Sequence, residues 1–159
     1  MKSILVSFKL NGKDVTVSCA SNHTLLDVLR NELALPGTKD ACSGEGECGA
    51  CTVIMDGAAV NSCLVFIGQV GGRSVETIEG LVKNGDLHPL QRAFVEAGAV
   101  QCGYCTPGMI MASKALLDQN PTPNDAEIRE GLSGNLCRCT GYVKIVDAVR
   151  IAAQEMAHG

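Results

Sequence analysis

The chain has 159 residues and a formal net charge of −4, so it has room for one domain or two small ones and lacks the positive field that attracts nucleic acid. No apolar run reaches the length of a transmembrane helix. The first residues alternate and then turn, without the unbroken apolar stretch of a signal peptide. These features predict a cytoplasmic protein with no membrane span and no nucleic-acid partner.

Cysteine and glycine dominate the composition, with 9 cysteines and 18 glycines but no tryptophan. A reducing compartment and an odd count both argue against a disulfide framework. Metal ligation by thiolates is the stronger interpretation, and it would explain how glycine-rich turns are held without aromatic packing.

The first predicted elements are two strands, residues 3–10 and 15–20, in which apolar and polar side chains alternate. Asn11-Gly12 between them is the pair that a type I′ hairpin turn prefers. Thr24 then predicts the start of a helix that ends at Pro36-Gly37. One apolar face of this helix is formed by leucines at helical spacing, Leu25, Leu26, Leu29 and Leu33.

A glycine-rich loop, residues 42–50, follows the helix and leads into a second predicted hairpin. The strands of this hairpin are residues 51–55 and 58–63, joined by the turn Asp56-Gly57, and residues 74–78 form a last strand. The order strand, strand, helix, loop, strand, strand predicts a small mixed sheet with one helix packed across it.

Four helices are predicted after Gly80, beyond a junction at residues 79–88. They cover residues 88–98, residues 106–120, residues 122–132 and the segment after Gly141. Thr106 and Thr122 are the expected N-caps of the second and third helices, and each is followed by proline. The last helix carries an apolar stripe, Ile145, Val149, Ala152 and Met156. The predicted architecture is α+β, with residues 1–80 as one domain and residues 81–159 as a helical domain.

Eight of the cysteines fall into two sets of four, one in each half. The first set is spaced C-x5-C-x2-C-x11-C and comprises Cys42, Cys48, Cys51 and Cys63. The second set is spaced C-x2-C-x31-C-x-C and comprises Cys102, Cys105, Cys137 and Cys139. The remaining Cys19 continues the alternation of its strand and is interpreted as a buried apolar residue.

The spacing favours iron–sulfur clusters over zinc. Structural zinc usually takes two short cysteine knuckles, and neither set supplies a pair of them. Glycines around three thiolates are typical of a plant-type [2Fe–2S] loop. Such a cluster is anionic and needs backbone N–H donors, and Gly44, Gly46 and Gly49 let the backbone fold around it. The histidines lie far from any cysteine pair, which excludes a Rieske centre.

The motif "GNLCRCTGY" places Cys137 and Cys139 two residues apart. On a strand or a helix such side chains diverge, so both can reach one site only from a turn. Cys102 and Cys105 directly precede the helix expected at Thr106, and another helix is expected after Thr140. Two helix N-termini would then face one anionic cluster.

Three motifs, "GECGACTV", "QCGYCTPGM" and "GNLCRCTGY", resemble those of the iron–sulfur subunit of the molybdenum hydroxylases, the xanthine dehydrogenase family. The resemblance covers nearly the whole chain. It implies an N-terminal ferredoxin-like β-grasp domain and a C-terminal four-helix domain, each binding one [2Fe–2S] cluster. Carried over by motif position, the first cysteine set holds the cluster that faces a flavin, and the second set holds the cluster near a molybdopterin. The resemblance also places Gln101 and Cys139 against the pterin. Because the second cluster must meet the pterin across an interface, we expect it to be the more buried of the two.

The implied partners are a large molybdopterin-binding subunit and a medium FAD-binding subunit, in a heterotrimer or a dimer of heterotrimers. One departure from the family pattern is the spacing between Cys42 and Cys48. Five residues separate them, whereas the family usually has one fewer. The extra residue is expected to bulge the loop at Gly44 or Gly46 without changing the ligand count.

The chain shows no dinucleotide fingerprint, P-loop or base–nucleophile pair. The resemblance implies that its role is electron transfer within a molybdenum-containing oxidoreductase, from the molybdenum centre through both clusters to the flavin. The favoured substrate, bound on another chain, is a purine or another N-heteroaromatic compound. Two alternatives stay open: a free-standing two-cluster ferredoxin, and a structural module held by zinc.

Overall fold

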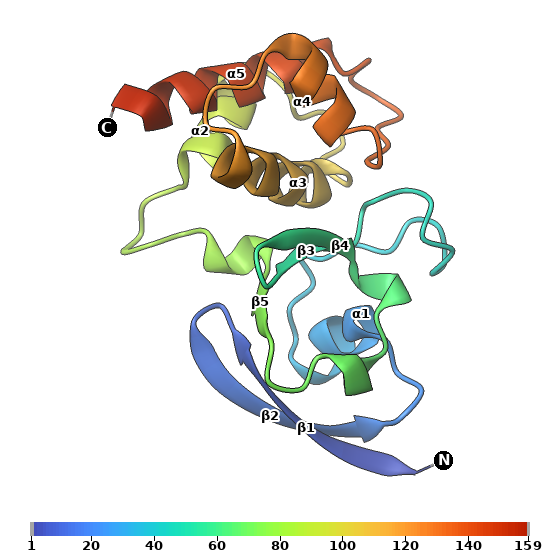
Figure 1. The fold of residues 1–159 in the computed structure, drawn as a ribbon. Helices are drawn as coiled ribbons and strands as arrows, with labels where there is room; N and C mark the ends of the chain where they lie inside the picture. The colour runs from blue at the N-terminus through green and yellow to red at the C-terminus, as the bar shows by residue number, and fades with distance from the viewer. Residues whose placement is uncertain (1, 159) are drawn as a thin grey trace.

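A computed structural model describes residues 2–158 of the chain. A sheet-containing half and a helical half lie against one another (Figure 1). No helix in the described part of the chain is long and apolar enough to cross a membrane.

The first half is built on a sheet of five short strands. These are β1 (Ser3–Leu10), β2 (Lys13–Ala20), β3 (Thr52–Met55), β4 (Ala58–Asn61) and β5 (Ser74–Glu76). Their order is β2-β1-β5-β3-β4. β1 and β5 run parallel, and the other neighbours are antiparallel. The predicted mixed sheet is therefore confirmed, although β4 and β5 are shorter than expected.

Both predicted hairpin turns form. Asn11 and Gly12 have φ angles of 50° and 80°, the left-handed pair that a type I′ turn requires. The Asn11 side chain also accepts a hydrogen bond from the N–H of Thr77 at 2.9 Å, so this turn is tied to the segment after β5. Cys19 is buried in the sheet core, as the alternation of β2 predicts.

The helix of the first half is short. α1 (Leu25–Asp27) begins at the predicted cap, where Thr24 and Asp27 form a reciprocal capping box. A π-helical turn, Val28–Glu32, continues it and closes with a hydrogen bond from the N–H of Leu33 to the carbonyl of Val28 at 3.0 Å. The helix thus ends before the predicted Pro36, because Ala34 already adopts a left-handed φ of 52°.

The second half contains the four predicted helices. They are α2 (Pro89–Glu96), α3 (Thr106–Gln119), α4 (Asp125–Gly131) and α5 (Val143–His158). Phe94, Met109 and Ile128 are fully buried among them. On α5, the stripe residues Ile145, Val149 and Ala152 are buried, but Met156 is 39% exposed and lies beyond this core.

Two predicted helix caps are wrong. Thr106 is the first helical residue of α3, and its cap position is taken by Cys105 without a side-chain hydrogen bond. Asn124 rather than Thr122 caps α4, accepting from the N–H groups of Ala126 and Glu127. An asparagine closer to the helix outcompetes the threonine, since its side-chain oxygen reaches the free N–H groups directly.

The two halves meet where α3 packs across β3, as Figure 1 shows. Ile54 of β3 is part of the helical core. A Cβ atom on Gly108 of α3 would lie 2.4 Å from the carbonyl oxygen of Gly49, so only glycine allows this approach. Lys114 of α3 reaches Glu76 of β5 at 3.5 Å. The junction is therefore closely packed and directly beneath the cysteine-bearing loop.

Candidate metal centres

The first cysteine set lies at one end of the sheet. Cys42, Cys48 and Cys51 come from the loop before β3, and Cys63 comes from the helical turn Ser62–Leu64 after β4. Cys51 and Cys63 are buried beside Leu26, whereas Cys42 and Cys48 are half-buried. Their side chains meet in pairs, Cys42 with Cys48 and Cys51 with Cys63. The structure thus brings together all four residues of the predicted set.

Backbone N–H groups surround this set. Burial alone would raise the pKa of Cys42, but hydrogen bonds from the Cys48 side chain and from the N–H groups of Gly46 and Glu47 lower it to about 7. Burial raises the pKa of Cys63 to about 12, and contact with Cys51 adds to this effect. One sulfur in the loop is therefore stabilised as an anion, while a buried one resists ionisation until a cation is bound.

The loop also carries the extra residue between Cys42 and Cys48. Ser43 and Gly44 both have left-handed φ angles, 55° and 83°. A Cβ on Gly44 would meet nothing within 4 Å, so the loop projects into open space there. Gly46 also has a left-handed φ, 79°, so both glycines named for the bulge adopt a conformation that glycine favours.

The second set lies where the starts of α3 and α5 approach one another. Cys102 and Cys105 directly precede the body of α3, and Cys137 and Cys139 lie in the turn before α5. The sulfurs of Cys102 and Cys139 are 3.6 Å apart. Cys105 and Cys137 form the other pair. The predicted turn therefore aims both closely spaced cysteines toward one place.

The pKa values of the second set follow the same pattern as those of the first, with one thiol raised and another lowered. Burial raises the pKa of Cys105 to about 12, with a further contribution from contact with Cys137. Burial would also raise the pKa of Cys137, but the hydroxyl and N–H of Thr140 outweigh it and lower the value to about 7. In each set one thiol is predisposed to ionise and a partner is not.

These arrangements fit a [2Fe–2S] cluster in each half. Among residues 2–158, no group of three or more His, Cys, Asp or Glu side chains is arranged to hold a single metal ion. Each set consists instead of two sulfur pairs that influence one another electrostatically, Cys42 acting on Cys63 and Cys102 acting on Cys105. Two irons with two thiolates each match two such pairs, and the surrounding N–H donors suit an anionic group.

The two cysteine sets differ in how exposed they are in this chain. Cys102 and Cys139 are exposed, and so is Gln101, whereas Cys51 and Cys63 are buried. The prediction that the second centre is the more buried concerns the assembled complex, and it stays a prediction. The outer sulfur pair of this centre lies at the surface because the turns that carry it project beyond the helices.

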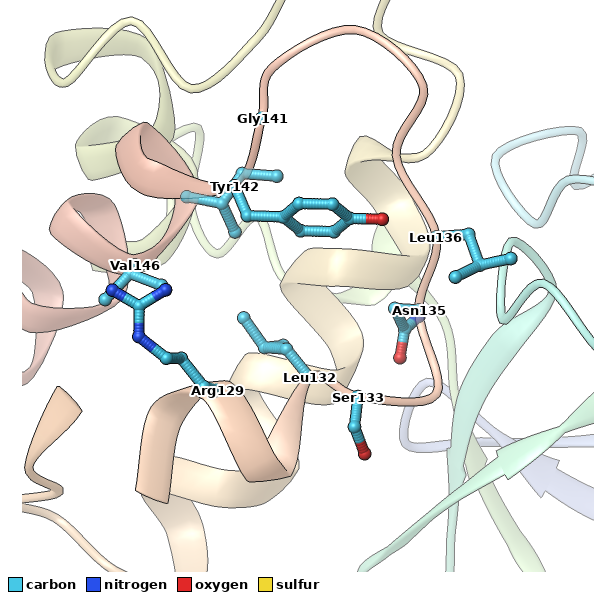
Figure 2. Close-up of a pocket in the computed structure, with 9 residues that line it drawn as sticks. Arg129, Leu132, Ser133, Asn135, Leu136, Gly141, Tyr142 and Val146 are labelled. Carbon is cyan, nitrogen blue, oxygen red and sulfur yellow. The ribbon is translucent and has the colours of Figure 1, made fainter. Parts of the chain in front are cut away.

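Several residues near the cysteines were not identified from the sequence. Asn135 is a buried polar residue whose side chain donates to the carbonyl of Gly49 at 2.8 Å. Tyr142 accepts a hydrogen bond from the N–H of Cys137 at 2.8 Å. These residues also line a cavity of about 340 Å³ between α4, α5 and the intervening loop (Figure 2). Only proximity in sequence to Cys137 could have indicated them.

Comparison with known proteins covers the whole chain. A model described as a 2Fe-2S iron-sulfur cluster binding domain matches residues 8–71, and one described as a [2Fe-2S] binding domain matches residues 77–150. The nicotinate dehydrogenase small FeS subunit of Eubacterium barkeri is 51% identical over 99% of this chain and 100% of its own length. The xanthine dehydrogenase iron-sulfur-binding subunit of Escherichia coli O157:H7 is 43% identical over 93% of this chain and 93% of its own length.

A solved structure agrees with this relationship. Quinoline 2-oxidoreductase from Pseudomonas putida 86 contains a chain that superposes with a TM-score of 0.95 and 41% identity, covering 100% of this chain and 99% of that one. The fold, the two matching cluster-binding domain models and the relatives all indicate the same family. The chain belongs to the iron–sulfur subunits of the molybdenum hydroxylase family, which includes xanthine dehydrogenase, and is an electron-transfer subunit of such an oxidoreductase.

Proposed function

We propose that this chain carries single electrons from a molybdopterin centre on a large partner subunit to a flavin on a medium partner subunit. Two [2Fe–2S] clusters supply the one-electron chemistry when bound. Cys42, Cys48, Cys51 and Cys63 would hold the first cluster, and Cys102, Cys105, Cys137 and Cys139 the second. We further propose that residues 1–80 and 81–159 are the two domains and that the complex is a cytoplasmic heterotrimer, single or paired.

One contact carries the proposed route between the two centres. The N–H of Leu136 donates a hydrogen bond to the carbonyl oxygen of Cys48 at 2.9 Å. Leu136 directly precedes Cys137, so a ligand of one set is joined to a ligand of the other by a few covalent bonds and one hydrogen bond. The hydroxyl of Tyr104, between Cys102 and Cys105, also donates to the carbonyl of Asp40 beside the first loop. These links hold the two ligand sets at a fixed separation.

The surface of the second set supports a partner on the molybdenum side. Gln101 and Cys139 are exposed, which leaves an amide and a sulfur available for the proposed pterin contact. Exposed apolar residues adjoin these cysteines in the chain, Val100, Tyr104, Leu136 and Val143. Apolar side chains around exposed ligand sulfurs are suited to burial against another subunit, which would exclude water from the cluster.

The other face supports the flavin side. Leu64 and Phe66 follow Cys63 closely and are 59% and 56% exposed. Leu64 also packs over Gly46 of the loop, since a Cβ there would lie 2.5 Å from its side chain. We propose that these residues contact the flavin-binding subunit, so that the first centre becomes enclosed on assembly.

The names of several relatives support a proposal for the substrate class. Nicotinate, xanthine and quinoline, for which three relatives are named, are all nitrogen heteroaromatics. We propose that the complex hydroxylates a compound of this class, and that purines are one possibility within it. Selection of the substrate would belong to the large subunit, because this chain contributes ligands for electron transfer and no acid–base pair.

Metal analysis and co-purification test this proposal. The native complex should contain iron and acid-labile sulfide sufficient for two [2Fe–2S] clusters per chain, with a visible spectrum, and should purify with two larger subunits. A colourless protein containing zinc would contradict it in favour of the structural alternative. A coloured protein that purifies alone would favour the free-standing carrier.

A further inference from the structure

Cys137 is held by a closed set of hydrogen bonds. Its Sγ accepts from the hydroxyl of Thr140 at 3.1 Å and from the Thr140 N–H at 3.4 Å. Its own N–H donates to the phenol oxygen of Tyr142 at 2.8 Å. The N–H of Tyr142 in turn donates to the Thr140 hydroxyl oxygen at 3.3 Å. The two residues therefore hold one ligand through both its sulfur and its backbone.

The Thr140 contact differs in kind from the other contacts to sulfur. Among the hydrogen bonds of the described residues, it is the one in which a side-chain hydroxyl donates to a candidate ligand sulfur. The remaining donors around the cysteines are backbone N–H groups or neighbouring thiols. A backbone donor is kept under any substitution except proline, whereas this hydroxyl depends on the identity of residue 140.

Tyr142 contributes to these hydrogen bonds from an unusual backbone conformation. Its φ is 69°, a left-handed value that is uncommon for a bulky residue. Gly141 before it has a φ of 66°, so two successive left-handed residues reverse the chain at the start of α5. Figure 2 shows the Tyr142 ring extending across the cavity toward Leu136. The phenol oxygen of Tyr142 thus accepts the hydrogen bond of the Cys137 N–H, whereas the sulfur of Cys137 accepts from Thr140.

A donor to a ligand sulfur stabilises negative charge, and the reduced cluster carries one more negative charge than the oxidised one. Removing such a donor lowers the reduction potential. We propose that Thr140 raises the reduction potential of the second centre through its O–H donation to Cys137. This inference rests on the proposed function, because it requires a [2Fe–2S] cluster on the second cysteine set. The step concerned is addition of one electron, supplied in the assay by dithionite, and no covalent bond of the chain changes.

The test is a redox titration of the purified complex followed by EPR, with both centres measured in one sample. Thr140→Val removes the hydroxyl at nearly constant shape. At a fixed potential the ratio of reduced to oxidised second centre should fall about tenfold, equivalent to about 59 mV for a one-electron couple. The reduction potential of the first centre should not change. Thr140→Ser keeps the hydroxyl and should restore the wild-type value.

Thr122→Val is the matched control, since Thr122 is exposed and lies in the loop before α4. It should leave both potentials unchanged. The inference would be overturned if Thr140→Val with its full iron content kept the wild-type reduction potential at the second centre. An equal shift in the reduction potentials of both centres would also overturn it. If Thr140→Val does not retain iron, Thr140→Ala removes the same hydroxyl with less bulk. Loss of iron from both variants, with retention in Thr140→Ser, would assign Thr140 to cluster assembly and also overturn the inference.

Iron content separates this inference from the proposed function. A wild-type complex with too little iron for two clusters would contradict the proposed function itself. A wild-type complex with both clusters and unmoved potentials in the variants would contradict only the role of Thr140.

Discussion

The side-chain amide of Asn135 donates to the backbone carbonyl of Gly49 at 2.8 Å, across 86 positions of sequence. The same nitrogen lies 3.1 Å from the hydroxyl of Thr52. Asn135 precedes Leu136 and Cys137, and Gly49 lies between Cys48 and Cys51. One buried amide therefore fastens the two ligand-bearing segments together.

Substitution of Asn135 tests this fastening. Asn135→Ala should destabilise the complex by about 1–3 kcal/mol, because a buried donor is removed from two acceptors. It should also change the magnetic interaction between the two reduced centres, which depends on their separation. Thermal unfolding and EPR of the fully reduced protein measure these effects. Asn120→Ala is the control, since Asn120 caps only a local turn. Equal behaviour of the two variants would show that Asn135 does not set the separation.

Gly108 provides a steric test of the joint between the halves. Gly108→Ala would place a Cβ atom 2.4 Å from the carbonyl of Gly49 and 3.2 Å from Cα of Ala50. The backbone cannot move aside as a flexible side chain can. We therefore expect the free energy of unfolding to fall by about 1–3 kcal/mol or more and the first cluster to be poorly retained. Gly134→Ala is the matched control, because a Cβ there meets nothing within 4 Å. Melting temperature and iron content distinguish the two variants.

Removal of one ligand should affect one centre. Cys105→Ser is expected to abolish the EPR signal of the second centre and to halve the iron content, while the first signal persists. Cys19→Ala is the control, since Cys19 is buried in the sheet core away from both sets. It should cost stability without loss of iron. Loss of both signals from Cys105→Ser would show that the two centres do not assemble independently.

Stability should fall in mild acid because of His88. Its Nδ1 accepts a hydrogen bond from the N–H of Leu90 at 3.2 Å and so caps α2. Burial, with a further contribution from Lys114, lowers the pKa of His88 below its ordinary 6.5. In the window between the lowered and the ordinary value the unfolded chain binds more protons, so stability is lost as the pH falls below 6.5.

Melting temperatures between about pH 5 and about pH 8 measure this dependence on the His88 charge. His88→Asn keeps an acceptor for the cap and should flatten the profile. His88→Ala should lower stability at every pH. A profile as steep in His88→Asn as in the wild type would assign the acid loss to other groups.

Local pattern was sufficient for most of the fold. Asn11-Gly12, the Thr24 cap and the alternation around Cys19 each depend on neighbours in the chain, and the structure confirms all three. The family resemblance of the cysteine motifs is likewise confirmed by the comparisons. The cap at Thr122 was wrong because Asn124 lies two positions nearer the helix. The cap at Thr106 was wrong because Thr106 is already the first helical residue of α3.

Long-range contacts could not be predicted in this way. The bond between Asn135 and Gly49 and the approach of Gly108 to the same carbonyl arise only when α3 is laid across β3. The exposure of Cys102 and Cys139 also depends on how far two turns project from the helices. Sequence spacing predicts which sulfurs belong together, but it does not predict how deeply each one is buried.

Because a hydrogen bond joins Leu136 to Cys48, neither half of the chain can be exchanged independently of the other. A gene fragment encoding either half would lose a backbone partner beside a ligand, together with the glycine contact beneath it. Engineers who wish to transplant one redox centre into another scaffold should therefore move both, and recombination that exchanges one half between relatives should succeed only where the counterpart residues travel with it.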